Sequence, residues 1–315
     1  MQLSDYVNTF GQSLLKKYGE KIHKISLNAN LTCPNRDGTK GIGGCTFCNN
    51  VSFSPNARDV DSITKQLSAG RKVILKRTGA KKYLAYFQAY TNTYGDVADL
   101  KKLYDLALSA NDIIGISIGT RPDCVPDEIL DLLANYQAQG YEVWLELGLQ
   151  SSFDETLKKV NRGHGFKEYH QAINRANKRN LKVCTHLILG LPGENQSHFE
   201  ITLNRVLSEG VAGLKLHPLH VVKGTQLARE WLRDEYKPLT ETEYVNIAAD
   251  LIEMTPDDIV YHRVTGTASK DILLAPKWCS KKWDIINRIT RELHNRKNNN
   301  NDISFNDIQH SLCLS

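Results

Sequence analysis

Short runs rich in β-branched and aromatic residues alternate with helical patterns along most of this sequence, and this alternation limits the available folds more than any other feature. Parallel strands need crossover connections, usually helices, and a sheet covered on both faces, so the pattern predicts an α/β fold with a parallel sheet. No G-x-G-x-x-G motif follows the first run, which favours a partial (β/α)6 barrel over a doubly wound sheet. The expected strands are 23–27, 83–88, 113–118, 141–147, 182–189 and 213–219, and the expected helices are 60–78, 97–109, 127–139, 154–180, 198–209 and 240–254.

The chain divides into three expected regions: an N-terminal helix at 1–20, the barrel at 21–262 and a C-terminal extension at 263–315. The extension combines a basic, aromatic helix with a polar tail, and its asparagine-rich stretch at 294–309 is expected to be a solvated linker or tail. Two S/T-x-x-E patterns, at Ser197 and at Thr240, predict capping boxes at helix starts.

Composition narrows the class of protein. The 315 residues are 41% hydrophobic and 24% charged, as in a globular chain with a sizeable core. There is no apolar run of eighteen residues and no basic-then-apolar start, so we expect no membrane span, no secretory signal and a cytoplasmic location. In a reducing compartment the seven cysteines are expected to bind metal, act in catalysis or lie buried. The net charge of +5 permits an anionic partner such as RNA without requiring one.

Three cysteines share one glycine-containing loop after the first expected strand: Cys33, Cys45 and Cys48, with the spacing C-x11-C-x2-C. They can form a disulfide with one thiol left over, a zinc site completed by a distant His or Cys, or an iron–sulfur site with one iron open to an external ligand. A loop without metal is the remaining alternative. The spacing favours iron–sulfur over zinc only modestly. The other cysteines are scattered and do not indicate a second cluster: Cys124, Cys184, Cys279 and Cys313.

Further motifs lie at successive expected strand ends, where barrel enzymes place their functional residues. Together with the cysteine loop they cover about residues 20 to 230: IGISIGTRPDCV (114–125), LELGLQS (145–151), NRGHGF (161–166), HLILGLPGE (186–194) and LKLHPLHVVKGTQL (214–227). In these motifs and their order the chain resembles radical SAM proteins. More narrowly, it resembles the radical SAM domain of the Elongator catalytic subunit and its small bacterial relatives without an acetyltransferase domain.

This resemblance implies a TIM-type partial barrel of the radical SAM type and a 4Fe-4S cluster bound by Cys33, Cys45 and Cys48. The open iron would bind S-adenosylmethionine (SAM), which such enzymes cleave with one electron to a 5′-deoxyadenosyl radical. Phe47, inside the last cysteine pair, would shield the cluster or simply pack in the core. Flavodoxin or ferredoxin would be a suitable electron donor.

The resemblance also places SAM contacts at strand ends and, for Arg162, one helix after the fourth strand. Arg162 suits a carboxylate by its planar fork, with a surface helix arginine as the alternative. His186 lies in an apolar strand and is alternatively a core histidine. The segment FQAYTNTYG lacks the glycine-glycine-acid stretch that usually receives the SAM amino group, so Gln88, Ala89 and Tyr90 would stand there instead. The full set of expected cofactor-binding residues is Gln88, Ser117, Glu146, Gln150, Arg162 and His186.

The expected substrate contacts end the sixth strand: Lys215 and His217 as catalytic residues, with His220 beside them. The resemblance implies tRNA as partner and, as reaction, the conversion of a wobble uridine's carboxymethylaminomethyl side chain to aminomethyl. Trp278 and Trp283, among many cations, suit nucleic acid or form an ordinary capping helix. Too little chain follows residue 265 for an acetyltransferase domain, so acetyl transfer is not expected. Radical chemistry on a small-molecule carboxylate and a zinc-bearing RNA-binding adaptor are the alternative functions.

Overall fold

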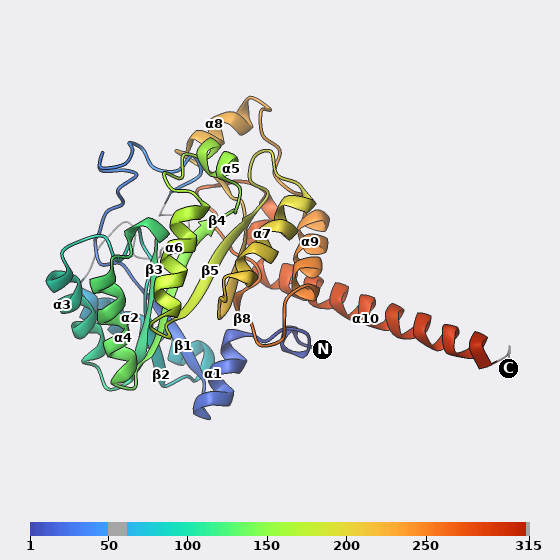
Figure 1. Ribbon diagram of the computed structural model, residues 1–315, viewed down its shortest axis with the longest axis horizontal. Helices are drawn as coiled ribbons and strands as arrows, with labels where there is room; N and C mark the ends of the chain where they lie inside the picture. The colour runs from blue at the N-terminus through green and yellow to red at the C-terminus, as the bar shows by residue number, and fades with distance from the viewer. Residues whose placement is uncertain (50–61, 313–315) are drawn as a thin grey trace.

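Seven parallel strands form one curled sheet in the computed structural model, which describes residues 1–49 and 62–312 and the side chains of residues 1–49 and 62–299 (Figure 1). Residues 60, 61 and Cys313, which the sequence analysis included, lie outside this range. The sheet order is β1 (Ile22–Leu27), β2 (Lys82–Phe87), β3 (Ile113–Thr120), β4 (Glu142–Gln150), β5 (Lys182–Leu189), β6 (Gly213–Pro218) and β8 (Val260–Arg263). Because β1 and β8 are the two edges, the sheet is an open partial barrel, and the predicted α/β partial barrel is confirmed.

The six predicted strands correspond to β1 through β6, and β8 is a seventh that the sequence analysis did not find. Its four residues, VYHR, include two polar ones and carry no run of apolar residues. A separate two-stranded antiparallel sheet joins β7 (Val221–Val222) to β9 (Leu273–Ala275).

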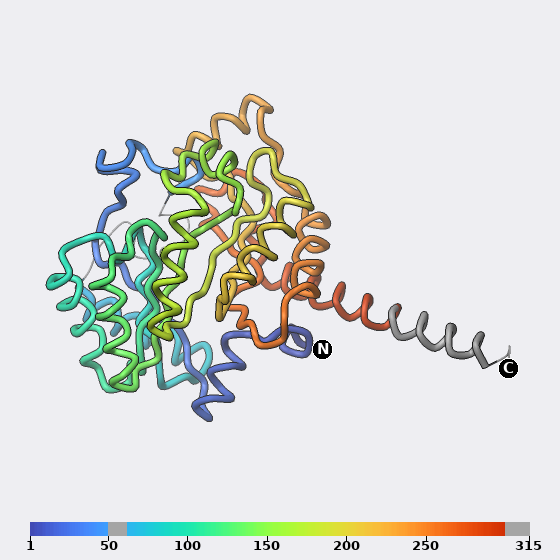
Figure 2. The backbone as a smooth tube through the Cα atoms, in the orientation of Figure 1, coloured from blue at the N-terminus to red at the C-terminus, as the bar shows by residue number. Residues whose placement is uncertain are grey.

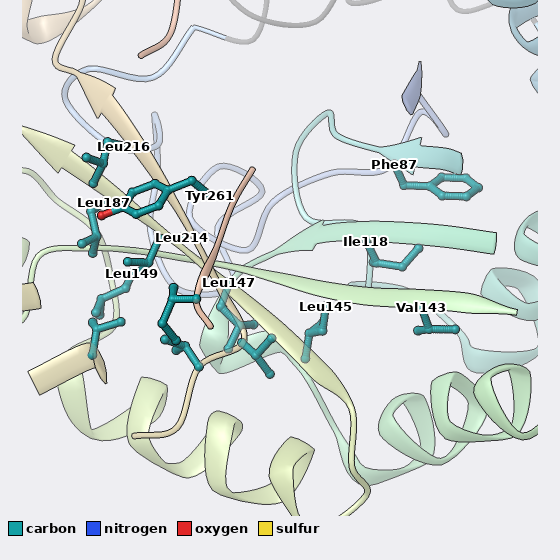
Figure 3. Packing of buried hydrophobic residues seen from close by; sticks show 14 of the residues in the cluster. Phe87, Ile118, Val143, Leu145, Leu147, Leu149, Leu187, Leu214, Leu216 and Tyr261 are labelled. Carbon is teal, nitrogen blue, oxygen red and sulfur yellow. The ribbon is translucent and has the colours of Figure 1, made fainter. Parts of the chain in front are cut away.

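Helices follow nearly every strand and pack on one face of the sheet, so β4 alternates between two environments. Val143, Leu145, Leu147 and Leu149 belong to the main core against the helices (Figure 3), whereas Glu146 lies on the inner face. The helices are α1 (Phe10–Tyr18), α2 (Ile63–Thr78), α3 (Val97–Leu108), α4 (Asp127–Ala138), α5 (Asp154–Lys159), α6 (Phe166–Asn177), α7 (Gln196–Ser208), α8 (Gln226–Leu232), α9 (Glu241–Glu253) and α10 (Lys282–Leu312).

The two predicted capping boxes had different outcomes. Thr240 caps α9 with Glu243, as expected. The prediction at Ser197 was wrong, because the N-cap of α7 lies two residues earlier, at Asn195, and His198 completes the box. Asparagine caps a helix as well as serine does, so Asn195, which precedes Ser197 by two residues, takes the N-cap position.

The first part of helix α10, in the C-terminal extension, packs on the barrel. Ile285, Ile289 and Leu293 of α10 belong to the main core, and Tyr6 lies 2.8 Å (Oη to Nδ1) from His294 where the N-terminus meets this helix (Figure 2). The helix continues to Leu312 through the stretch expected to be a linker or tail; no Gly or Pro interrupts it. Of the two tryptophans proposed for RNA, Trp278 donates to the Leu239 carbonyl and packs on Tyr244, while Trp283 is 65% exposed.

At the amino end of the barrel, the buried Glu142 holds α1 against the sheet. Its carboxylate accepts hydrogen bonds from Lys17 (2.5 Å) and Tyr18 (2.7 Å) of α1, from Lys182 of β5 (2.7 Å) and from the Trp144 indole (2.8 Å). Burial by itself raises the pKa of Glu142, but the bonds from Lys17, Lys182 and Tyr18 outweigh it and lower the pKa from 4.5 to about 2.

This carboxylate makes stability depend on pH in acid. A carboxyl group whose pKa is lower in the folded state stabilises the fold above its unfolded pKa of 4.5, and this stabilisation is lost as the pH falls towards 2. In urea titrations between these pH values, we expect the free energy of unfolding to fall less in Glu142→Gln than in the wild type, by at least about 1 kcal/mol. Parallel pH curves for the two proteins would contradict this.

Candidate active site

A cavity opens at the carboxyl ends of the strands, beneath the loop that follows β1. It encloses about 1250 Å³ including its open mouth, and it is lined from the cysteine loop, from β2 through β6 or the loops that follow them, and from the end of β8. Figure 1 shows this loop at the same end of the sheet as α5 and α8, with α1 at the opposite end. This is the end at which barrel enzymes collect their chemistry.

Cys33, Cys45 and Cys48 all line this cavity, and none of them forms a disulfide. Asn35 Nδ2 lies 3.8 Å and Arg162 Nη1 3.5 Å from Cys45 Sγ. Burial raises the pKa of the Cys48 thiol and nearby Cys45 adds to this, whereas Arg36 and Arg162 act in the opposite direction. The loop therefore places three sulfur atoms at one cavity, with guanidinium groups beside them that favour the thiolate form.

Phe47 lines the same cavity and also packs on the apolar cluster that contains Leu219 and Leu227. Both roles considered for it in the sequence are therefore compatible with its position. The hydrogen bonds Thr46 N to Val160 O (3.0 Å) and Leu227 N to Thr46 O (2.9 Å) anchor this part of the loop to its neighbours.

Arg162 is buried in a loop rather than exposed on a helix. The predicted helix at 154–180 is broken into α5 and α6 at NRGHG, where Asn161 and Gly163 have positive φ (52° and 72°). The guanidinium donates from Nη2 to the Gly148 carbonyl (2.5 Å) and faces the cavity, while its Nε has no hydrogen-bond partner among the described residues. The alternative of a surface arginine is excluded.

Gly148 and Gln150, at the end of β4, leave space for Arg162. A Cβ atom at Gly148 would lie 2.8 Å from Gln150 Nε2 and 2.9 Å from Arg162 Nη2. Gln150 itself has a positive φ of 82°, which is uncommon for a residue other than glycine, and its side chain lines the cavity. Gln88 lines the cavity as well and is contacted by Ser26 Oγ at 3.2 Å.

A buried charge cluster lies beneath the cavity, centred on Glu146. This fully buried carboxylate pairs with Lys24 and Lys215, accepts from Ser117 (2.5 Å) and accepts from His186 Nε2 (2.8 Å). His262 Nδ1 lies 3.4 Å from it. Of this cluster only His186 lines the cavity, so Ser117, Glu146 and Lys215 lie below its surface.

The charged groups of this cluster shift one another's pKa values. Burial opposes ionisation of Glu146, but Lys215 and Lys24 hold its pKa well below 4.5. Burial lowers the pKa of Lys215 to about 8, against the attraction of Glu146, and burial with Lys215 nearby lowers that of His186 to about 4. At neutral pH Glu146 is thus ionised, Lys215 is protonated, and the neutral His186 imidazole donates to the Glu146 carboxylate.

The far wall of the cavity is built by the ends of β6 and β8 and carries His217, His220 and Arg263. Burial and Arg263 hold the pKa of His217 well below 6.5, and burial lowers that of His220 to about 4. Both imidazoles are therefore neutral at physiological pH.

The predicted residues thus fall into two groups. Cys33, Cys45, Cys48, Gln88, Gln150, Arg162, His186 and His217 line one cavity, whereas Ser117, Glu146 and Lys215 support it from below. Tyr90, expected beside Gln88, also lines the cavity, and so do three arginines that no sequence pattern assigned to the site: Arg36, Arg121 and Arg263. Arg121 could have been expected at the site, because it belongs to the TRPD motif at a strand end. Its guanidinium pairs with Asp123 (2.9 Å) and donates to the Arg162 carbonyl (2.8 Å). Arg263 was missed because its strand was missed.

Among the described residues, no three His, Cys, Asp or Glu side chains are grouped to hold one metal ion, and no helix is both long and apolar enough to cross a bilayer. The thiolates of an iron–sulfur cluster bind separate irons, so such ligands need to line one cavity rather than meet at one point. Three cysteines, buried arginines and polar strand ends around one space suit a sulfur-ligated cofactor together with an anionic ligand.

An open parallel barrel with a three-cysteine loop after its first strand defines a class of cofactor-dependent enzymes, and comparison with known proteins identifies the class. Residues 17–206 match the Radical SAM superfamily and residues 211–295 match the Radical_SAM C-terminal domain. The chain belongs to the radical SAM superfamily.

Individual relatives agree with this assignment. Protein YhcC of Escherichia coli is 48% identical over 294 residues, which cover 93% of this chain and 94% of YhcC. Elongator complex protein 3 of Schizosaccharomyces pombe is 32% identical over 151 residues, covering 45% of this chain and 26% of that protein. The solved structure of Elp3 from Methanocaldococcus infernus superposes with a TM-score of 0.65 at 17% identity, over 88% of this chain and 63% of that one, and so shares the fold.

Proposed function

We propose that this radical SAM enzyme holds a 4Fe-4S cluster on Cys33, Cys45 and Cys48 and binds SAM beside Gln88, Gln150 and Arg162. When bound, these cofactors supply one-electron chemistry and hydrogen abstraction. The observation that supports the assignment is that all six side chains line a single cavity at the strand ends. The residues fit the group: the Arg162 guanidinium is buried and its Nε has no partner among the described residues, as expected of a cation that awaits a carboxylate.

Under this proposal the buried cluster positions the cavity lining. Glu146 fixes the ring of His186, because the Nε2–H of a neutral imidazole donates to the carboxylate, and Lys215 holds Tyr86 by a hydrogen bond of 2.9 Å. Glu146, Ser117 and Lys215 then act through residues that face the cavity.

As substrate we propose the wobble uridine of tRNA, with its carboxymethylaminomethyl side chain converted to aminomethyl. The resemblance to the Elongator catalytic subunit supports the tRNA part, and the mildly basic composition is compatible with it. The reaction breaks the bond between the side-chain nitrogen and the carboxymethyl carbon. SAM, consumed to methionine and 5′-deoxyadenosine, would be the two-electron oxidant that removes hydrogen from this carbon, with the priming electron returned, and water would split the resulting imine into the aminomethyl group and a two-carbon aldehyde acid. A reduced electron carrier, such as flavodoxin or ferredoxin, would supply the electron.

The test is a reaction of the anaerobically reconstituted protein with tRNA that carries the carboxymethylaminomethyl group. With SAM and dithionite, mass spectrometry of the nucleosides should show conversion to the aminomethyl form, and reactions without SAM should show none. The same assay identifies the two-carbon fragment. An unchanged wobble uridine, in protein that still cleaves SAM, would reject the substrate while leaving the cofactor assignment in place.

Gly148→Ala tests the SAM-binding side of the cavity without removing any polar group. The new methyl group would displace the ends of the Gln150 and Arg162 side chains, which are flexible, so the fold should persist. We expect the Kd for SAM to rise about tenfold, the effect of losing one hydrogen bond to a charged group. Gly11→Ala in α1, where a Cβ meets nothing within 4 Å, is the matched control and should leave the Kd unchanged.

A further inference from the structure

Arg263 differs from the other arginines of the cavity in having no partner for its side chain among the residues that the structure describes. Arg36 donates to the Cys48 carbonyl (2.7 Å), Arg121 pairs with Asp123 (2.9 Å) and Arg162 donates to the Gly148 carbonyl (2.5 Å). Within the described part of the chain, the Arg263 guanidinium takes part in no hydrogen bond or ion pair, although it lines the cavity. A partly buried cation without a counterion costs free energy, and an anion that binds beside it lowers this cost.

Two neutral imidazoles face the same space. Nε2 of His217 and Nε2 of His220 are shielded from solvent and have no hydrogen-bond partner among the described residues. His217 lies in β6 and His220 two residues beyond its end, and both line the cavity.

Gly266 allows this wall to form. A Cβ atom at this position would lie 2.7 Å from His217 Nδ1, so the chain after β8 passes directly against the histidine ring. Arg263, His217 and His220 therefore line the same side of the cavity.

A guanidinium without a counterion is complementary to a carboxylate, which it binds through two parallel hydrogen bonds. We infer that Arg263 binds the carboxylate of a carboxymethylamino group on the substrate. This inference rests on the proposed function and deepens it, because it makes Arg263 the residue that distinguishes the carboxymethylaminomethyl group from the aminomethyl product.

The experiment measures the affinity of the reconstituted enzyme for two otherwise identical tRNAs, one with the carboxymethylaminomethyl group and one with the aminomethyl group. Wild type should bind the first at least about tenfold more tightly, as expected for a charged hydrogen-bonded pair. Arg263→Gln should bring this ratio close to one while the Kd for SAM changes less than twofold. Arg263→Lys keeps the positive charge but not the paired donors of the guanidinium, so it should retain only part of the preference for the carboxymethylaminomethyl tRNA. If the glutamine variant folds poorly, the lysine variant provides the test. Arg77→Gln, an exposed arginine at the end of α2, is the matched control and should keep the full ratio.

Other outcomes would overturn the inference. Equal weakening of both tRNAs by Arg263→Gln would mean a contact to backbone phosphate, and a weakened Kd for SAM with an intact ratio would mean that Arg263 holds the SAM carboxylate. A wild type without preference would also reject it. Preferential binding without conversion of the bound tRNA would support the role of Arg263 and reject the proposed reaction, so the two failures are distinguishable.

Discussion

Replacing Cys33, Cys45 or Cys48 individually with serine is expected to abolish the cofactor and with it all SAM cleavage. Wild-type protein purified without oxygen should contain about four iron and four sulfide per chain, the content of a 4Fe-4S cluster. Each variant should fall below about one, because the loop supplies three ligands and none in excess. Iron and sulfide analysis and the visible absorption spectrum measure this directly, and 5′-deoxyadenosine formation after dithionite measures the activity.

Cys279→Ala is the matched control, since Cys279 is fully buried in the small apolar cluster beside β9 and lies outside the cavity lining. It should keep the wild-type iron content. Stoichiometric zinc in the wild type, without 5′-deoxyadenosine, would instead support the RNA-binding adaptor. A serine variant that kept its iron would show that its cysteine is no ligand.

The second large effect is expected from the buried Glu146 cluster. Glu146→Leu leaves Lys24 and Lys215 without their carboxylate, and removing one partner of a buried ion pair costs about 3–5 kcal/mol of unfolding free energy. Lys215→Met should be costly as well, because it removes one of the cations that offset the burial of Glu146. The double variant should lose clearly less than the sum of the two, since each change removes the charge that the other leaves unpaired. Urea unfolding at neutral pH gives all three values.

The exposed pair Lys101–Asp105 on α3 provides the comparison, with side chains 52% and 45% exposed. Lys101→Met should cost less than about 0.5 kcal/mol, because water already screens this pair. If Glu146→Leu were equally mild, or if the double variant lost the full sum, the residues would not be coupled through buried charge.

The strands and the cysteine loop could be predicted from local sequence patterns. The strands were found because each of the six has a run of apolar and β-branched residues between helical patterns, and the cysteine loop was found because three thiols occur within sixteen residues. Strand ends then placed Gln150 and His186 at the cavity, since parallel strands present their carboxyl ends at one edge. The strand at 260–263 had no such run and was missed, and Arg263 with it.

The order of strands, the cysteine loop and the polar strand ends were therefore determined by the sequence, because periodicity and spacing are local properties of the chain. Only the tertiary structure decided which polar residues face the cavity and which lie beneath it. Glu146 and Gln150 share one face of β4 and look equivalent in sequence, yet Lys24 and Lys215 arrive from strands more than sixty residues away and neutralise Glu146 in the interior. Charge pairing across such distances depends on packing in three dimensions, which no local pattern records.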